Sequence, residues 1–352
     1  MKIVMERFPH LAEQILQKLD NEGLAKSREV KQVWQTFIDE RDYPWLRIVN
    51  ISTVLPKGNT YFHLAAEHGQ IDAFKMILNE DNNADPKDDD WGATPYLIAC
   101  ANGRMNIASM LLKKSKELKV DLNQRDKGDN TALHLACEEG HSDIATLIMK
   151  NSSKLKIDLN TKHSGGGTAF HEVCTGGHSE IAEIMINNSS KLNINFSTKD
   201  NRDDTGFHSA CYKGHFEIVK MILENSPRLQ IDLDGKDIGG YTGFELVIMY
   251  GHLDIAEMVI NKSLSLKINL DTTCNGGSTV FHLACVGDQT RIVEMVIEMS
   301  ECHKIDLRAK DKRYGETGYQ MAEYFRRTEV INLIKTKMPS LAMLHSSSCC
   351  IN

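Results

Sequence analysis

The chain lacks the features of a secreted, membrane-spanning or nucleic-acid-binding protein. No uncharged apolar run approaches the ~18 to 20 residues that cross a bilayer. The N-terminus carries charges such as Glu6, Glu13 and Lys18 and has no apolar stretch of the secretory type. The net charge is −7, whereas binding to phosphates favours a clustered basic face. We therefore expect a cytoplasmic protein, with the nucleus as an alternative location, and no nucleic-acid partner.

Residue patterns for catalysis are also absent. The nine cysteines form no C-x-x-C pair, so free thiols are expected in a reducing compartment. Carboxylates form no isolated pair, and the serines at 346–348 have no partnered base. The glycines at 165–167 lack the lysine and the spacing of a phosphate-binding loop. The sequence predicts no enzyme and no cofactor.

An internal repeat dominates the sequence instead. A threonine recurs at intervals of 34, 37, 37, 37, 37, 37 and 38 residues. Identical consecutive intervals indicate a repeated structural unit. The threonines that open the units are Thr60, Thr94, Thr131, Thr168, Thr205, Thr242, Thr279 and Thr317.

Each unit has the same order of segments. The threonine precedes a short apolar helix, as at 132–137, and its hydroxyl can cap the first free N–H groups. A glycine then gives the positive φ of a tight turn and is usually followed by histidine, as at Gly140 and His141. A second amphipathic helix follows. A stretch of alternating polarity and a polar turn lead to the next threonine.

This pattern resembles the ankyrin-repeat family. The T-P-L-H-x-A signature of that family is matched best at 94–99 and 131–136, which read TPYLIA and TALHLA. The resemblance covers about residues 58–335. It implies an all-α solenoid of about eight helix-turn-helix units with short β-hairpin-like turns. A 37-residue unit exceeds the usual ~33 by about four residues, which we expect to lengthen the second helix or its exit loop.

The two ends of the repeat region should differ from its middle. Terminal units of a solenoid cap the stack and are atypical. The last unit, with Tyr319 to Arg327, lacks the Gly-His turn and is more polar, so it is predicted to be the C-terminal cap. Residues 336–352 are predicted to be a flexible tail.

Histidines and cysteines recur in the units and could suggest metal ligands. Four units show H-x-x-C, with the histidine three residues and the cysteine six residues after the threonine. Each unit offers only two ligands, and equivalent positions in stacked helices lie ~8–10 Å apart, so neighbouring units cannot easily share a zinc ion. We expect the cysteine to be a small core residue and the histidine to bond the turn backbone or the threonine.

Residues 1–57 do not follow the repeat. Apolar residues at helical spacing predict a compact element of two or three helices. The segment resembles the F-box, which implies docking to the Skp-type adaptor of a cullin-RING ubiquitin ligase. Phe8 stands where the motif has leucine. The alternative is an N-terminal helical cap on the solenoid. The residues expected at the adaptor contact are Pro9, Ile15, Leu16, Leu19 and Trp34.

The C-terminal residues Cys349-Cys350-Ile351-Asn352 have the outline of a prenylation signal. Asparagine is an unusual last residue for that signal, and no polybasic run precedes it. Lipidation of Cys349 or Cys350 is therefore one reading, and a plain tail is the other. A membrane partner is expected only if the tail carries a lipid, and a single lipid anchors weakly.

Solenoids bind partners on the exposed positions of one concave face. The family resemblance places these positions at the turn tips and at the end of each first helix. Aromatic and methionine residues there are typical of a protein-binding hot spot, and the alternative is packing between repeats. The candidate partner-binding residues are Glu138, Glu139, Tyr212, Lys213, Tyr241, Met249, Tyr250 and Tyr314.

Two functional hypotheses follow. The first is a substrate-recruiting subunit of a cullin-RING ligase, in which the N-terminal segment binds the adaptor and the repeats select a target protein. The second is a ligase-independent ankyrin scaffold or adaptor, membrane-attached if the tail is lipidated.

Overall fold

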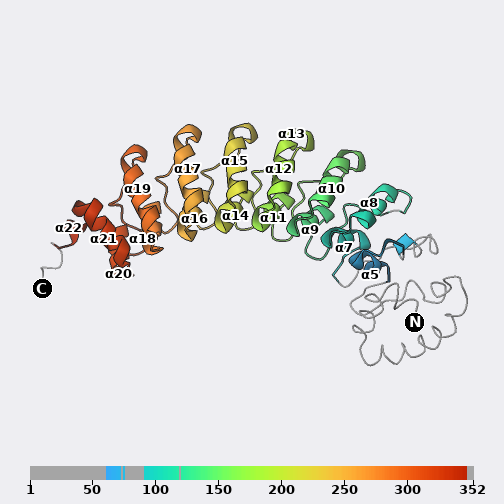
Figure 1. Ribbon diagram of the computed structural model, residues 1–352, viewed down its shortest axis with the longest axis horizontal. Helices are drawn as coiled ribbons and strands as arrows, with labels where there is room; N and C mark the ends of the chain where they lie inside the picture. Colours follow the sequence, from blue (N-terminus) through green and yellow to red (C-terminus); the bar gives the residue numbers. More distant parts are fainter. Residues whose placement is uncertain (1–60, 73, 76–90, 119, 347–352) are drawn as a thin grey trace, which may run out of the picture. The chain divides into compact units, whose positions relative to one another are not determined.

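The computed structural model describes residues 61–72, 74–75, 91–118 and 120–346 (Figure 1). Every regular element among these residues is a helix, and strand-like pairing is limited to the isolated bridges Thr273–Thr279 and Lys310–Thr317. The predicted all-α repeat architecture is confirmed. No helix in this part of the chain has the length and apolarity needed to span a membrane. The F-box-like segment, Cys349 and Cys350 lie outside the described residues.

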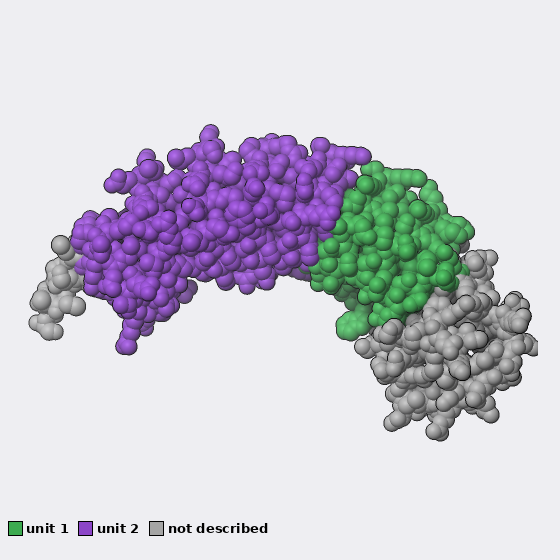
Figure 2. All heavy atoms as spheres, viewed as in Figure 1, with its two compact units in different colours: residues 1–164 green, residues 165–352 purple. Residues whose placement is uncertain are grey.

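The chain divides into two compact units, Met1–Ser164 and Gly165–Asn352, coloured separately in Figure 2. We refer to them as unit 1 and unit 2. The described helices of unit 1 are α5 (Tyr61–His68), α7 (Pro95–Ala101), α8 (Met105–Lys114), α9 (Ala132–Glu138) and α10 (Ser142–Leu155).

Unit 2 repeats the same pair of helices several times. Its first helices, α11, α14, α16, α18 and α20, pack side by side in chain order (Figure 1). The helices are α11 (Ala169–Gly176), α12 (Ser179–Asn187), α13 (Ser189–Leu192), α14 (Gly206–Lys213), α15 (Phe216–Leu229), α16 (Gly243–Tyr250), α17 (Leu253–Leu266), α18 (Val280–Val286), α19 (Thr290–His303), α20 (Gly318–Tyr324), α21 (Thr328–Lys337) and α22 (Pro339–Ser346).

The repeat threonine is the N-cap of each first helix from α7 to α20, as predicted. In most repeats the histidine three residues later completes the cap. The His208 Nδ1 accepts the backbone N–H of Thr205 at 3.2 Å and lies 2.8 Å from its hydroxyl. The His208 Nε2 lies 2.9 Å from the carbonyl oxygen of Gly235, on the following turn. Because a carbonyl only accepts, Nε2 carries the proton, and the histidine connects its helix to the next repeat.

The second helix accounts for the extra residues of each repeat. Helices α10, α15, α17 and α19 each span 14 residues, so the helix itself is lengthened. A buried serine closes its last turn: the Ser263 hydroxyl donates to the Ile260 carbonyl at 2.6 Å, and the Ile268 N–H donates to the Ser263 carbonyl at 2.9 Å. Lys267, between them, adopts a left-handed φ of 58°. This arrangement stops the helix without glycine.

The turns between repeats are hairpin-like, as predicted, and form a hydrogen-bonded ladder in unit 2. Within one turn, the Asp237 N–H donates to the Tyr241 carbonyl at 3.0 Å. Between turns, the Ile238 N–H donates to the Arg202 carbonyl at 2.8 Å, and the Lys312 N–H donates to the Gly276 carbonyl at 2.9 Å. These backbone bonds hold neighbouring turns in register.

The C-terminal end differs from the sequence prediction. Residues 336–352 are predicted to be a flexible tail, but α21 continues to Lys337 and α22 spans Pro339–Ser346. Leu341 of α22 is buried, and the two helices pack against each other. Proline suits the first helical position, and an apolar residue two positions later gives the helix a surface to bury.

Candidate protein-binding surface

The last residues of each first helix define the candidate site. They lie seven and eight positions after the repeat threonine, just before the glycine turn. In unit 1 the predicted residues at these positions are Glu138 and Glu139, at the end of α9, and both are exposed. In unit 2 these positions hold large apolar residues on three first helices, α14, α16 and α20, and we call this set the aromatic ridge. The aromatic ridge consists of Tyr212, Met249, Tyr250, Tyr324 and Phe325.

Tyr212 and Tyr250 form the centre of the aromatic ridge. Their ring centres are 4.5 Å apart with an interplanar angle of 76°, an edge-to-face contact between α14 and α16. The Lys213 ammonium lies 5.1 Å from the centre of the Tyr212 ring. Burial raises the pKa of Tyr250, with a further contribution from Tyr212. Even so, Tyr212 and Tyr250 remain 42% and 48% exposed, so the pair keeps a large apolar surface open to a partner.

Repeat-to-repeat hydrogen bonds hold the backbone of the aromatic ridge in place. The His252 Nε2 donates to the Tyr212 carbonyl at 3.1 Å, and the Gln289 amide donates to the Met249 carbonyl at 3.4 Å. In the last repeat the Arg327 guanidinium donates to the Val286 carbonyl at 2.9 Å. The histidine of the Gly-His turn therefore caps the first helix of the preceding repeat. Such caps satisfy carbonyls that a helix end leaves free.

Tyr324 and Phe325 belong to the ridge but were not among the predicted residues. They are 82% and 46% exposed, and their ring centres are 5.1 Å apart at 86°. The sequence prediction treats this segment as a polar cap because the Gly-His turn is missing. Their position in the repeat could have identified them, because both residues follow Thr317 by the same intervals at which Tyr212 and Lys213 follow Thr205.

Tyr241 and Tyr314 lie on the hairpin-like turns, so they form a second feature. The Tyr241 N–H donates to Asp237 Oδ1 at 2.8 Å, and its side chain is half-buried. Burial, followed by the neighbouring Cys274, raises the pKa of Tyr241 to about 12. Tyr314 is 67% exposed. Of the predicted residues in unit 2, the structure brings together Tyr212, Lys213, Met249 and Tyr250 on helix ends.

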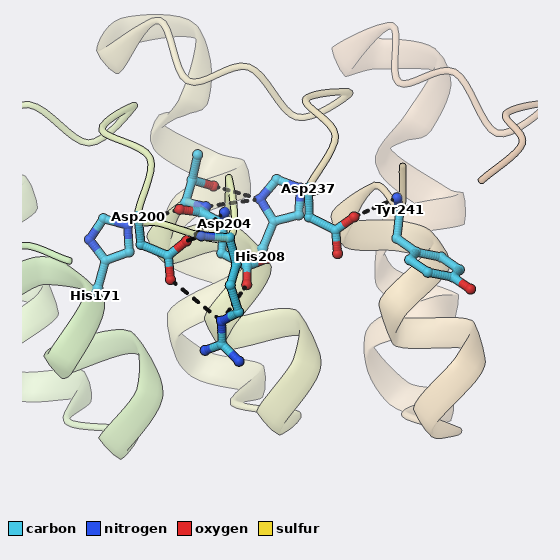
Figure 3. Close-up of polar contacts among 8 residues, drawn as sticks. His171, Asp200, Asp204, His208, Asp237 and Tyr241 are labelled. Carbon is cyan, nitrogen blue, oxygen red and sulfur yellow. Dashed lines mark hydrogen bonds and ion pairs between the residues drawn. The ribbon is translucent and has the colours of Figure 1, made fainter. Parts of the chain in front are cut away.

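The polar residues near these turns form hydrogen bonds that hold the turns in shape (Figure 3). Asp200 Oδ1 accepts the N–H groups of Arg202 and Asp204 at 2.7 and 2.9 Å. The His171 Nε2 lies 3.1 Å from the Asp204 carbonyl. Burial, with the nearby carboxylates of Asp200 and Asp237, raises the pKa of Asp204 to about 6. These hydrogen bonds fix the hairpin-like turn and connect it to the preceding first helix.

The recurring histidines and cysteines have structural roles, in agreement with the sequence prediction. His171, His208 and His282 each bond the repeat threonine and the next turn. Cys211 and Cys285 are fully buried, and this burial raises the pKa of each thiol well above the usual range for cysteine. A buried, protonated thiol packs as a small apolar side chain. Within the described ranges, no three potential ligand residues gather at a metal-binding distance.

The geometry defines a class of helical-repeat protein, and sequence comparison identifies the family. Residues 62–163 and 153–237 match the family described as ankyrin repeats (3 copies). The chain belongs to the ankyrin-repeat family, whose members are typically non-enzymatic modules for protein–protein interaction. A search of curated proteins finds no significant match.

Proposed function

We propose that the chain recruits a target protein on the aromatic ridge of unit 2 and presents it to a cullin-RING ubiquitin ligase. The exposed Tyr212–Tyr250 pair is the observation that carries this proposal. Tyrosine is enriched in interface hot spots, where loss of one side chain costs about 2 kcal/mol or more. An edge-to-face pair also holds both rings in one orientation before binding, which lowers the entropy lost on association.

The ligase part of the proposal depends on the F-box-like segment. Its residues Pro9, Ile15, Leu16, Leu19 and Trp34 would contact a Skp-type adaptor. This chain would supply no catalytic residue and would act in the cytoplasm by holding the target near the ligase core. The support is the resemblance of residues 8–34 to the F-box together with a separate binding surface on the repeats.

Affinity capture with the full-length chain tests both parts. Tyr212→Ala with Tyr250→Ala should abolish recovery of the target, while Leu264→Ala should leave it unchanged. Leu264 is the matched control because it is 70% exposed and lies on the second helix α17. Circular dichroism should show equal helix content in all variants. Recovery of the same target by the double variant would place the binding site elsewhere.

Ile15→Asp with Leu16→Asp tests the ligase part separately. This variant should lose a Skp-type adaptor and retain the target. If the wild-type chain recovers no such adaptor, the ligase part fails and a ligase-independent scaffold remains. Membrane association that disappears on deletion of 349–352 would favour the lipid-attached form of that scaffold.

A further inference from the structure

The last hairpin-like turn of unit 2 carries a cluster of cations, which we call the basic hairpin. The four side chains are all exposed, in a chain whose net charge is −7. Tyr314, in the same turn, is 67% exposed. The cations of the basic hairpin are Arg308, Lys310, Lys312 and Arg313.

Three carboxylates lie in or beside the basic hairpin: Asp306 and Glu316 flank it, and Asp311 lies within it and is turned inward. Asp311 is 4% exposed and accepts backbone N–H groups from Arg313, Tyr314 and Glu316 at 3.1, 3.2 and 3.1 Å. Burial acts to raise the pKa of Asp311, but these hydrogen bonds outweigh it and hold the pKa below its usual range. The Asp311 charge therefore shapes the turn and does not pair with the neighbouring cations.

The cations of the basic hairpin have no carboxylate partner among the described residues. Other cations of unit 2 do: Lys337 lies 2.7 Å from Glu294, and Lys262 lies 3.6 Å from Glu224. Because an exposed ion pair contributes little to stability, the lack of carboxylate partners for these four cations costs the fold little. Their positive field is available to an incoming anion.

Aromatic surface accompanies this charge. The Arg313 Nη2 lies 3.9 Å from where a Cβ would stand on Gly276, so the guanidinium extends over the preceding turn. Tyr241 lies two turns back in the same ladder. Backbone bonds from Lys312 to Gly276 and from Asn275 to Gly239, at 2.9 and 3.0 Å, fix the three turns relative to one another. The basic hairpin and Tyr241 thus lie on turns of one backbone-bonded ladder, two turns apart.

We propose that the basic hairpin and Tyr241 bind an acidic, extended peptide segment of the recruited protein. The proposal rests on the proposed function and names the chemistry of the target. Charge complementarity selects an acidic partner, and arginine can pair with a carboxylate through two parallel hydrogen bonds. Tyr241 and Tyr314 supply ring surface and hydroxyl groups for side chains between the acidic residues. A short acidic segment fits better than a nucleic acid, because the rest of this acidic chain would repel a long polyanion.

Fluorescence anisotropy with labelled probes tests the proposal on the full-length chain. The first probe is a 12-residue peptide that alternates glutamate with leucine and phenylalanine. The second replaces each glutamate with glutamine, and the third is a 12-nucleotide single-stranded DNA. The acidic peptide should bind at least about 10-fold more tightly than the glutamine peptide at low salt. The preference should shrink as salt shortens the ~10 Å screening length of 0.1 M solutions.

Lys312→Glu with Arg313→Glu should weaken binding of the acidic peptide by at least about 10-fold. Lys191→Glu with Lys335→Glu is the matched control, since both lysines are exposed, lie outside the basic hairpin and have no ion-pair partner in the described part of the chain. It makes the same change in net charge and should alter binding less than about 2-fold. An equal effect of both double variants, no binding of the acidic peptide, or tighter binding of the DNA would overturn the proposal.

Self-association and target capture provide two further tests, which separate this inference from the proposed function. Light scattering that shows self-association lost in Lys312→Glu with Arg313→Glu would make a second copy the occupant and would overturn the proposal. Target capture that depends on Tyr212 and Tyr250 but not on Lys312 and Arg313 would refute this inference alone. Capture that depends on neither pair would refute the proposed function, whatever the peptide assay shows.

Discussion

Glu245 provides a sharp test of how the repeats are held together. It stands where most repeats have the capping histidine, and it is fully buried on α16. Its Oε2 accepts the Thr242 N–H at 2.8 Å, and its Oε1 accepts the Thr272 hydroxyl at 3.0 Å. A histidine donates to a carbonyl of the next turn, whereas a carboxylate only accepts, so this repeat uses a threonine hydroxyl instead.

The size of the effect follows from these two bonds. Glu245→Ala leaves the Thr242 N–H and the Thr272 hydroxyl without their acceptor inside the protein. A buried unsatisfied polar group costs about 1–3 kcal/mol, so we expect a loss of about 2–4 kcal/mol in the free energy of unfolding. Glu245→Gln retains an acceptor for Thr242 and places an amide donor toward Thr272, so its cost should be small.

The free energy of unfolding should depend on pH differently in wild type and in Glu245→Gln, and the direction of that difference follows from the pKa of Glu245. Burial raises the pKa of Glu245 in the folded protein. When folding raises the pKa of a carboxyl group, its contribution to stability is fully present at pH values below the pKa of the unfolded state. That contribution is lost as the pH rises through the pKa of the folded state. Glutamine does not ionise, so the Glu245→Gln variant does not lose stability in this way. The glutamine variant should therefore gain stability relative to wild type as pH rises above 4.5, the ordinary pKa of glutamate.

Urea unfolding followed by circular dichroism measures this difference at each pH. The reasoning would be refuted if Glu245→Gln and Glu245→Ala were equally destabilised. It would also fail if the advantage of the glutamine variant decreased with rising pH.

Two other predictions test the repeat interior. Lys267→Gly should raise the free energy of unfolding by about 0.5–1 kcal/mol in urea titrations, because Lys267 has a φ of 58° and glycine adopts that conformation without strain; an unchanged or lower midpoint would contradict this. In a Cys349→Ser, Cys350→Ser background, a thiol reagent should label exposed Cys302 quickly and the buried Cys137 and Cys285 only on unfolding. Rapid labelling of the buried pair would contradict the packing.

The sequence predicted the repeat because its key residues act locally. A threonine cap needs only the N–H groups of its own helix, and the capping histidine lies three residues away. The partner of His252 could not be predicted in this way, because the Tyr212 carbonyl is 40 positions earlier and the bond exists only once repeats stack. Buried Asp311 also looks like any surface aspartate until the turn closes around it.

The candidate site was predicted only in part, for a related reason. Tyr212 and Tyr250 were assigned to an exposed face from their position in the repeat, and the structure shows that their rings touch. Tyr324 and Phe325 were missed because a missing glycine-histidine turn was taken to mean a polar cap. The turn is formed there by Arg326 in a left-handed conformation with a φ of 56°, so the repeat geometry persists without glycine.

Site-specific photo-crosslinking tests the central claim, that a protein partner binds the aromatic ridge, most directly. A benzophenone amino acid placed at Tyr250, and separately at Leu264, compares the aromatic ridge with an exposed site on the second helix α17. We predict one crosslinked protein from position 250 and none from position 264. Crosslinking from position 264 alone, or from neither position while the target is still captured, would contradict the claim.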